Sequence, residues 1–280
     1  MRCLIAVAAL ILVPGSAFTQ GGARELPLNS NVVARLRDGS TIYGRLERLG
    51  TDSLVVIGSA GRLAIARANI RDVRDAGVAH ARADGSNEYW FPNSNTTRLL
   101  FAPTGRTLGR GEGYFADHDI VIGSIAVGVT DRLTIGGGTL IIPNSDFWFV
   151  TPKVGIVRGD NFNLAVGALF GGVGSETGGI GYVAATIGGT DRSLTAAVGN
   201  GFAGGTASQD QVFMLGGETR VSRRISLITE NYFGTGFDDA LLSYGVRFLG
   251  EKFSVDLAFM NSAKNGVFPG IPYVDFVWKW

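Results

Sequence analysis

The sequence has few of the side chains that most catalytic and metal sites need. Its 280 residues include one cysteine, Cys3, and two histidines, His80 and His118. Because Cys3 lies within an expected signal peptide, the mature chain should have no thiol, which excludes disulfides, cysteine catalysis and metal sites built from cysteine. The charges nearly cancel, with a net value of +1. A chain so close to neutrality gives no electrostatic reason to expect nucleic acid as a partner.

Long apolar runs are equally scarce. At the N-terminus, Met1 and Arg2 precede an apolar run at 4–13 and a Pro-Gly-Ser-Ala stretch at 14–17, which together have the charged, apolar and small-residue regions of a secretory signal peptide. We therefore expect residues 1–17 to be a signal peptide, with cleavage near Ala17. No later segment has the ~20 uninterrupted apolar residues that a membrane-spanning helix requires. No helix is expected to hold this protein in a membrane.

Glycine is abundant, with 42 residues in a chain that is 45% hydrophobic. Without helix-period stretches, this composition favours an all-β fold of short strands and tight turns. The last strand, 273–280, is apolar at every second position from Val274 to Trp280. A strand of a closed membrane barrel shows apolar side chains to lipid at alternate positions and aromatic ones at the interface. The alternative is the final strand of a soluble β-sandwich, which has the same alternation.

Residues 31–75 have a character of their own. They contain four or five short alternating segments separated by turn signals, which predict a small compact β domain. The Asp38-Gly39 turn, the central Gly44 of the next strand and the closing Ile70 to Val73 segment resemble the Sm-like and SH3-like small-barrel families. We expect residues 76–96 to be a linker to the next domain.

Residues 97–280 form a succession of predicted hairpins. Tight-turn signals recur about thirty residues apart, which is the length of two membrane-crossing strands and a connection. These turns are at 130–131, 159–161, 190–192, 222–224 and 250–252. Looser polar or glycine-rich connections lie between them, and the count of strands is about twelve. This region resembles Gram-negative outer-membrane β-barrel proteins as a class, which implies short periplasmic turns, longer outer loops and an antiparallel transmembrane barrel.

The alternation also assigns the two faces of the predicted barrel. Phe276, Trp278 and Trp280 should face lipid and form the signal that, by the same resemblance, the barrel-assembly machinery reads. Eight charged side chains have the opposite parity and should face the lumen: Lys153, Glu218, Arg220, Glu230, Arg247, Asp256, Asp275 and Lys279. Because acids and bases lie on neighbouring strands, they form either a charged constriction that filters solutes or a salt-bridged set that fills the interior.

An enzymatic function has one candidate centre. His118 lies between Asp117 and Asp119, and a histidine beside a carboxylate can act as a general base. A serine nucleophile would have to lie on a neighbouring strand, and Ser124, the nearest in sequence, is expected on the same strand as His118. We therefore assign no catalytic residue, no metal site and no cofactor.

The sequence thus predicts a small periplasmic β domain followed by an outer-membrane barrel of about twelve strands, with outer-membrane lipid and the assembly machinery as partners. The leading functional hypothesis is a pore for small solutes. A structural or adhesion barrel, whose domain at 31–75 docks a periplasmic partner, is the alternative from a different class, and a barrel hydrolase is the third.

Overall fold

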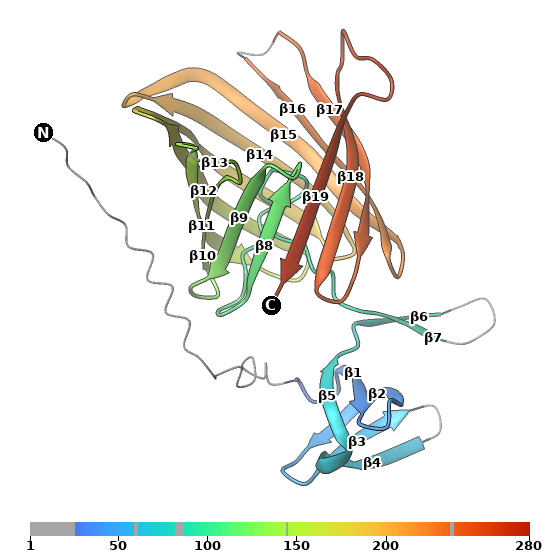
Figure 1. Cartoon of the computed structure of the whole chain (residues 1–280). Coiled ribbons are helices and arrows are strands. Elements are labelled where there is room, and N and C mark those ends of the chain that lie inside the picture. The colour runs from blue at the N-terminus through green and yellow to red at the C-terminus, as the bar shows by residue number, and fades with distance from the viewer. Residues whose placement is uncertain (1–25, 59–60, 82–86, 144, 236–237) are drawn as a thin grey trace, which may run out of the picture.

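A closed barrel forms the larger part of the computed structural model, which describes residues 26–58, 61–81, 87–143, 145–235 and 238–280. Within these residues, twelve antiparallel strands close the wall, each paired with its neighbour along the chain (Figure 1). The last strand pairs with the first and places Asp275 opposite His118. The all-β fold and the count of twelve are therefore confirmed. The predicted signal peptide, 1–17, lies outside the described residues.

The strands of the wall are β8 (Gly113–His118), β9 (Ile122–Gly128), β10 (Leu133–Leu140), β11 (Trp148–Arg158), β12 (Phe162–Val173), β13 (Glu176–Gly188), β14 (Arg192–Ala203), β15 (Thr206–Ser222), β16 (Ile225–Gly234), β17 (Leu241–Leu249), β18 (Phe253–Ser262) and β19 (Ile271–Lys279).

The two ends of the barrel differ in their connections. All five predicted tight turns join consecutive strands at one end, which we call the turn end. The opposite, loop end carries the longer connections 141–147, 235–240 and 263–270. Two glycine-rich stretches expected to be loose loops are instead extensions of the strands, because Gly174 and the pair Gly204-Gly205 adopt positive φ and close tight hairpins. Positive φ is strained for other residues, so glycine permits these turns.

The outer face of the wall is apolar. Large hydrophobic side chains remain exposed on every strand from β8 to β19, including Phe115, Val166 and Leu257, whereas charged side chains such as Arg247 and Asp256 are fully buried inside. This polarity is the reverse of a soluble protein and is that of a transmembrane barrel, whose closed hydrogen-bonded wall leaves no backbone group unpaired in lipid. In the part of the chain that the structure describes, no helix is long and apolar enough to cross a bilayer.

A separate five-stranded sheet precedes the barrel. It contains β1 (Asn31–Leu36), β2 (Thr41–Leu49), β3 (Ser53–Gly58), β4 (Gly61–Ala66) and β5 (Ile70–Asp75), with the short helix η1 (Arg67–Asn69) before β5. The strand order is β4-β3-β2-β1-β5, around a core that includes Val32, Leu46 and Leu54. The sheet is not closed by a ladder between β4 and β5, so the small closed barrel and its Sm-like or SH3-like identity remain predictions.

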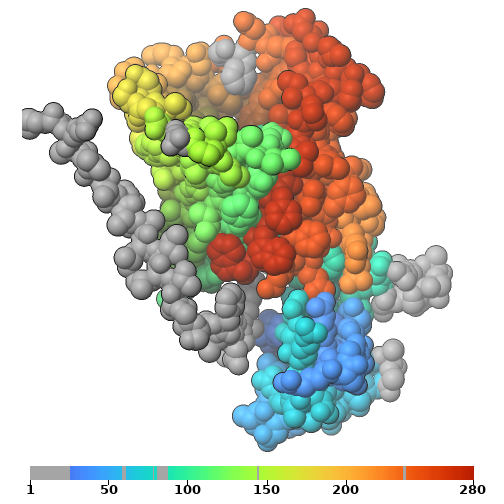
Figure 2. Space-filling view, in the orientation of Figure 1, coloured from blue at the N-terminus to red at the C-terminus, as the bar shows by residue number. Residues whose placement is uncertain are grey.

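The small sheet contacts the turn end of the barrel (Figure 2). Arg35 of β1 and Arg74 of β5 both bind Glu251 in the turn between β17 and β18, at 2.5 and 2.9 Å. The predicted linker contains a hairpin of β6 (Val78–Ala81) and β7 (Asn87–Trp90). Beyond β7 the chain enters the barrel.

The wall begins at Gly113, and not at Thr97 as the sequence pattern predicts. Residues 91–108, here called the plug, are largely buried and contact inward side chains of the wall. The plug can be followed from β7 to β8 in Figure 1. Its middle forms a short hairpin, in which Thr104 donates to the carbonyl of Thr97 and Leu99 to that of Ala102. These local bonds give the segment strand-like character without a place in the wall.

Candidate functional site

Arg247 on β17 is the centre of the contacts that hold the plug. Its guanidinium donates two bonds of 2.7 Å to Asp256 and one of 2.7 Å to Glu218. Two further bonds of 2.8 Å reach the backbone carbonyls of Asn95 and Leu99 in the plug. These five contacts use the full donor capacity of a guanidinium. A fully buried arginine is thereby compensated in charge and in hydrogen bonds.

Glu230 on β16 binds the tip of the plug hairpin. Its carboxylate accepts bonds from three successive backbone N–H groups, those of Leu100, Phe101 and Ala102, at 2.8, 3.1 and 2.9 Å. Tyr232 donates a fourth bond of 2.7 Å. Consecutive N–H groups that converge in a turn form a concave anion site. Here the anion is the Glu230 carboxylate of the wall, and the N–H groups of the plug form the concave site.

Other charges fix the remainder of the plug. Arg98 of the plug pairs with Asp275 on β19. Lys153 on β11 donates to the carbonyl of Thr97 at 2.7 Å. Arg220 on β15 donates to the carbonyl of Phe91 at 2.7 Å. The plug is therefore bound from both sides of the lumen, mainly through its backbone.

The structure places the eight predicted lumen charges as follows. Seven are buried inside the barrel: Lys153, Glu218, Arg220, Glu230, Arg247, Asp256 and Asp275. The eighth, Lys279, is half-buried at the turn end, 3.5 Å from Glu112. Six of the seven bind plug residues directly, and Asp256 acts through Arg247. These charges therefore converge on residues 91–108 inside the barrel.

The three residues expected to form the assembly signal all point outward. Phe276, Trp278 and Trp280 are exposed on the last strand. Trp280 also closes the seam of the barrel, because its backbone N–H donates to the carbonyl of Gly113 at 3.0 Å. Its ring lies where a side chain at Gly113 would be, since a Cβ there would come within 2.3 Å of the indole.

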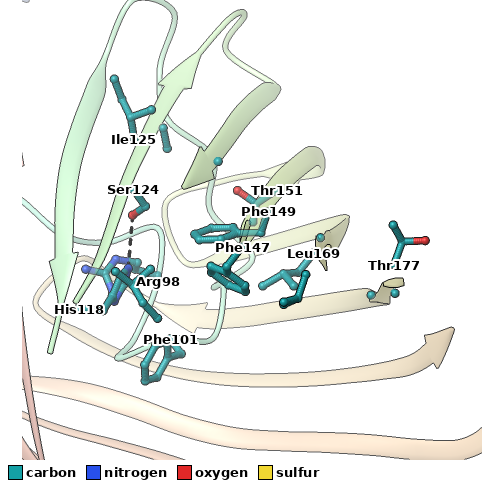
Figure 3. Close-up of a pocket in the computed structure, with 18 of the residues that line it drawn as sticks. Arg98, Phe101, His118, Ser124, Ile125, Phe147, Phe149, Thr151, Leu169 and Thr177 are labelled. Carbon is teal, nitrogen blue, oxygen red and sulfur yellow. Dashed lines mark hydrogen bonds between the residues drawn. The ribbon is translucent and has the colours of Figure 1, made fainter. Parts of the chain in front are cut away.

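A cavity of about 550 Å³ remains between the plug and strands β8 to β14. Phe101 and Arg98 of the plug form one side of it, and Phe147, Phe149 and Leu169 face them (Figure 3). The lining extends to the loop end through residues 171–173 and 176–179. Most of the lining surface is apolar, so the cavity suits a molecule with substantial apolar area.

The expectation that Ser124 shares a strand with His118 is wrong. The chain reverses at Asp119 and Ile120, both of which have positive φ, and this turn separates β8 from β9. A turn with two non-glycine residues of positive φ has no strong sequence signal. The reversal brings His118 Nε2 to 3.3 Å from Ser124 Oγ (Figure 3). On its other side, His118 Nδ1 lies 3.0 Å from Tyr273 Oη and 3.2 Å from Asp275 Oδ1.

Sequence reasoning missed the plug and its Arg98. The segment has no charge run or alternation that separates it from a strand and loop. The one sequence signal was the charge of Arg98, a residue that the assignment of side chains to the lipid and lumen faces did not include. Among the described residues, no group of three or more His, Cys, Asp or Glu side chains is positioned to hold a metal ion.

No protein-family model matches the chain, and a search of curated proteins finds no match. Among solved structures, similar chains include the KdgM porin in complex with disordered oligogalacturonate (9% identity, TM-score 0.41, 60% of this chain and 95% of that one) and the NanC porin (10%, 0.41, 60% and 97%). The outer membrane protein Omp33 of Acinetobacter baumannii is another (11%, 0.35, 60% and 95%). The closed barrel architecture follows from the strand pairing of this chain itself.

Proposed function

We propose that the protein is an outer-membrane channel for small solutes that rests in a closed state, with the plug as its gate. The observation that carries this proposal is the contact at Glu230, whose carboxylate accepts hydrogen bonds from three successive backbone N–H groups of the plug. Bonds to backbone groups of a movable segment can be exchanged for water when that segment shifts. Every strand of the wall pairs with a neighbour on both sides, so the barrel can stay closed in lipid without the plug.

The proposed location follows from the outer surface. A closed barrel with an apolar exterior belongs in the outer membrane, and an even number of strands leaves the small sheet and the C-terminus at the same end. We assign that turn end to the periplasm. The protein should fractionate with outer membranes and migrate differently on gels before and after heating. Recovery as a soluble periplasmic monomer would overturn both the location and the channel.

The contact between the small sheet and the barrel supports a role in gating. The chain passes from β5 through the β6–β7 hairpin directly into the plug. Displacement of the small sheet from Glu251 would therefore pull on Phe91, the first plug residue, whose carbonyl is held by Arg220. We propose that a periplasmic partner of residues 31–75 acts on the plug by this route.

Conductance in a planar bilayer tests the gate. Glu230→Gln replaces a carboxylate, which accepts bonds from three N–H groups, by an amide that has one acceptor oxygen and one NH2 donor. The plug should then be held less firmly, so the variant channel should open more often than the wild type. Asp160→Asn, in an exposed turn, is the matched control and should behave as the wild type does. If wild type and Glu230→Gln are equally silent under every condition, the barrel is a closed structural or adhesion protein and not a channel.

The final strand carries a separate proposal. We propose that Trp280 acts as an assembly signal for the barrel-assembly machinery and also completes the seam with Gly113. Deletion of Trp280 should sharply reduce the amount of heat-modifiable protein in the outer membrane. Refolding of the same variant in detergent separates the two roles, because a seam defect persists without the machinery and a signal defect does not.

A further inference from the structure

The contacts of His118 have the order of a serine hydrolase site. Ser124 on β9 is 3.3 Å from His118 Nε2, and the Asp275 carboxylate on β19 is 3.2 Å from His118 Nδ1. A nucleophile, a base within reach of it and a third group that orients the base are the three parts of such a site. The three residues come from three neighbouring strands of the wall, so the backbone ladder fixes their spacing.

The surrounding bonds determine which nitrogen carries the proton. The hydroxyl of Tyr273 donates to the carbonyl of Leu100 at 3.2 Å, so its oxygen can accept from the imidazole. Asp275 Oδ1 is a buried carboxylate oxygen with no hydrogen bond of its own among the described residues. Tyr273 Oη lies within hydrogen-bond distance of Nδ1, and Asp275 Oδ1 lies 3.2 Å from the same nitrogen, so we place the proton on Nδ1. Nε2 is left with its lone pair directed at Ser124, as a general base requires.

The site opens on the apolar cavity between the plug and strands β8 to β14. Ser124 and His118 both line the cavity, which gives them a space of about 550 Å³. Phe101 stacks on the imidazole, with ring centroids 5.2 Å apart, and covers its face, while the two nitrogens at the ring edge contact Tyr273 and Ser124. Because the lining is mostly apolar, the group bound next to Ser124 should be an uncharged hydrocarbon chain or ring.

We propose that Ser124, His118 and Asp275 form a catalytic triad that hydrolyses an ester with an apolar acyl group. Ser124 Oγ attacks the ester carbonyl as its proton passes to His118 Nε2. The bond from carbon to the alkoxy oxygen breaks, and His118 returns the proton to the departing alcohol. Water, activated by the same histidine, then cleaves the acyl-serine and releases the acid. Asp275 retains its charge and stabilises the imidazolium in both steps.

Arg98 is the group that can stabilise the negative oxygen of the intermediate. Arg98 lines the cavity, and two of its guanidinium nitrogens bind Leu100 and Asp275. The Nε–H is buried and has no hydrogen-bond partner among the described residues. A buried free donor at a reaction site costs stability in the resting state and contributes when charge develops on the substrate.

Covalent labelling of the refolded protein tests the triad. A fluorescent fluorophosphonate should label the wild type and not Ser124→Ala, and p-nitrophenyl butyrate and decanoate should be hydrolysed with the same dependence. His118→Asn should slow hydrolysis about a hundredfold or more. Ser254→Ala is the matched control, because Ser254 is a buried inward serine without a hydrogen-bond partner among the described residues. Heat-modifiable migration reports whether each variant is folded.

A second variant covers the case in which Ser124→Ala does not fold. The chain without residues 1–17 contains no other thiol, so a Ser124→Cys substitution can be followed with iodoacetamide. Its thiol should react at least about tenfold faster than the same thiol in a double variant that also has His118→Asn, since an adjacent histidine promotes the thiolate. The proposal is overturned if folded wild type neither labels nor hydrolyses either ester. It is also overturned if labelling persists in folded Ser124→Ala. Neither result bears on conductance, so this test is independent of the channel.

Discussion

The two sides of the barrel wall face one lumen with different chemistry. Strands β15 to β19 contribute the buried charges Glu218, Arg220, Glu230, Arg247, Asp256 and Asp275, whereas the buried charge described on β9 to β14 is Lys153. Most of the charged contacts to the plug come from β15 to β19, and the cavity lies against the other side. The outer faces of the two sides are equally apolar. The comparison shows that contact with lipid requires an apolar outer face on both sides of the barrel. The inner faces have no such constraint, so one side can anchor the plug while the other lines the cavity.

The largest effect should come from the centre of the charged side. Arg247→Met leaves Asp256 and Glu218 buried without their cation, and breaking such a pair costs about 3–5 kcal/mol. Urea unfolding in detergent micelles, followed by tryptophan fluorescence, measures the free energy. Adding Glu218→Gln and Asp256→Asn should recover part of the loss, because no uncompensated charge then remains. A single substitution that unfolds like the wild type would show that the lumen is wet enough to solvate these groups.

Lys153 gives the contrasting result on the cavity side. Its ammonium is buried and donates to the carbonyls of Thr97 and Thr104 at 2.7 and 3.5 Å, with no ion pair to a carboxylate in the described residues. Lys153→Met removes a desolvated charge and one good hydrogen bond, two changes of opposite sign. We expect a stability within about 1 kcal/mol of the wild type, measured by the same unfolding assay. A loss as large as that of Arg247→Met would remove the distinction between the two sides.

The wall could be predicted from the sequence because its rules are local. Alternation assigns each residue to a face, and the glycine and aspartate turns mark where strands reverse. Arg247 and Asp256 were both expected to face the lumen, and they form a directly opposed pair on neighbouring strands. The positions of five tight turns and the parity of Phe276 followed from the same rules.

The plug and the His118 site could not be predicted, because both depend on contacts distant in sequence. Glu230 binds residues about 130 positions earlier, and no local pattern marks either partner. At the reversal, Asp119 and Ile120 both have positive φ, which non-glycine residues seldom adopt. Once that turn was missed, Ser124 was assigned to the wrong strand. A single turn thus decided whether the histidine had a nucleophile beside it.

The outer faces should respond alike where the inner faces differ. Leu257 on β18 and Val154 on β11 are both exposed on the lipid side near the middle of their strands. A lysine on the lipid face costs about 2–4 kcal/mol at mid-depth, so Leu257→Lys and Val154→Lys should each lose a similar amount. Refolding into lipid vesicles at graded urea concentrations measures both. A much smaller loss for one of them would indicate that its strand faces a protein neighbour and not lipid.

The smallest effect should come from the contact between the small sheet and the turn end. Glu251 binds Arg35 and Arg74, and all three side chains are about one third exposed. Exposed ion pairs contribute at most about 1 kcal/mol each and weaken with salt, so Glu251→Gln should leave the unfolding of the barrel unchanged. What should change is the attachment of the domain. Limited proteolysis should cleave the hairpin region 78–90 faster in the variant than in the wild type, and added salt should bring the wild type toward the variant. Cleavage that is insensitive to both would mean that other contacts hold the domain and that Glu251 does not link it to the plug.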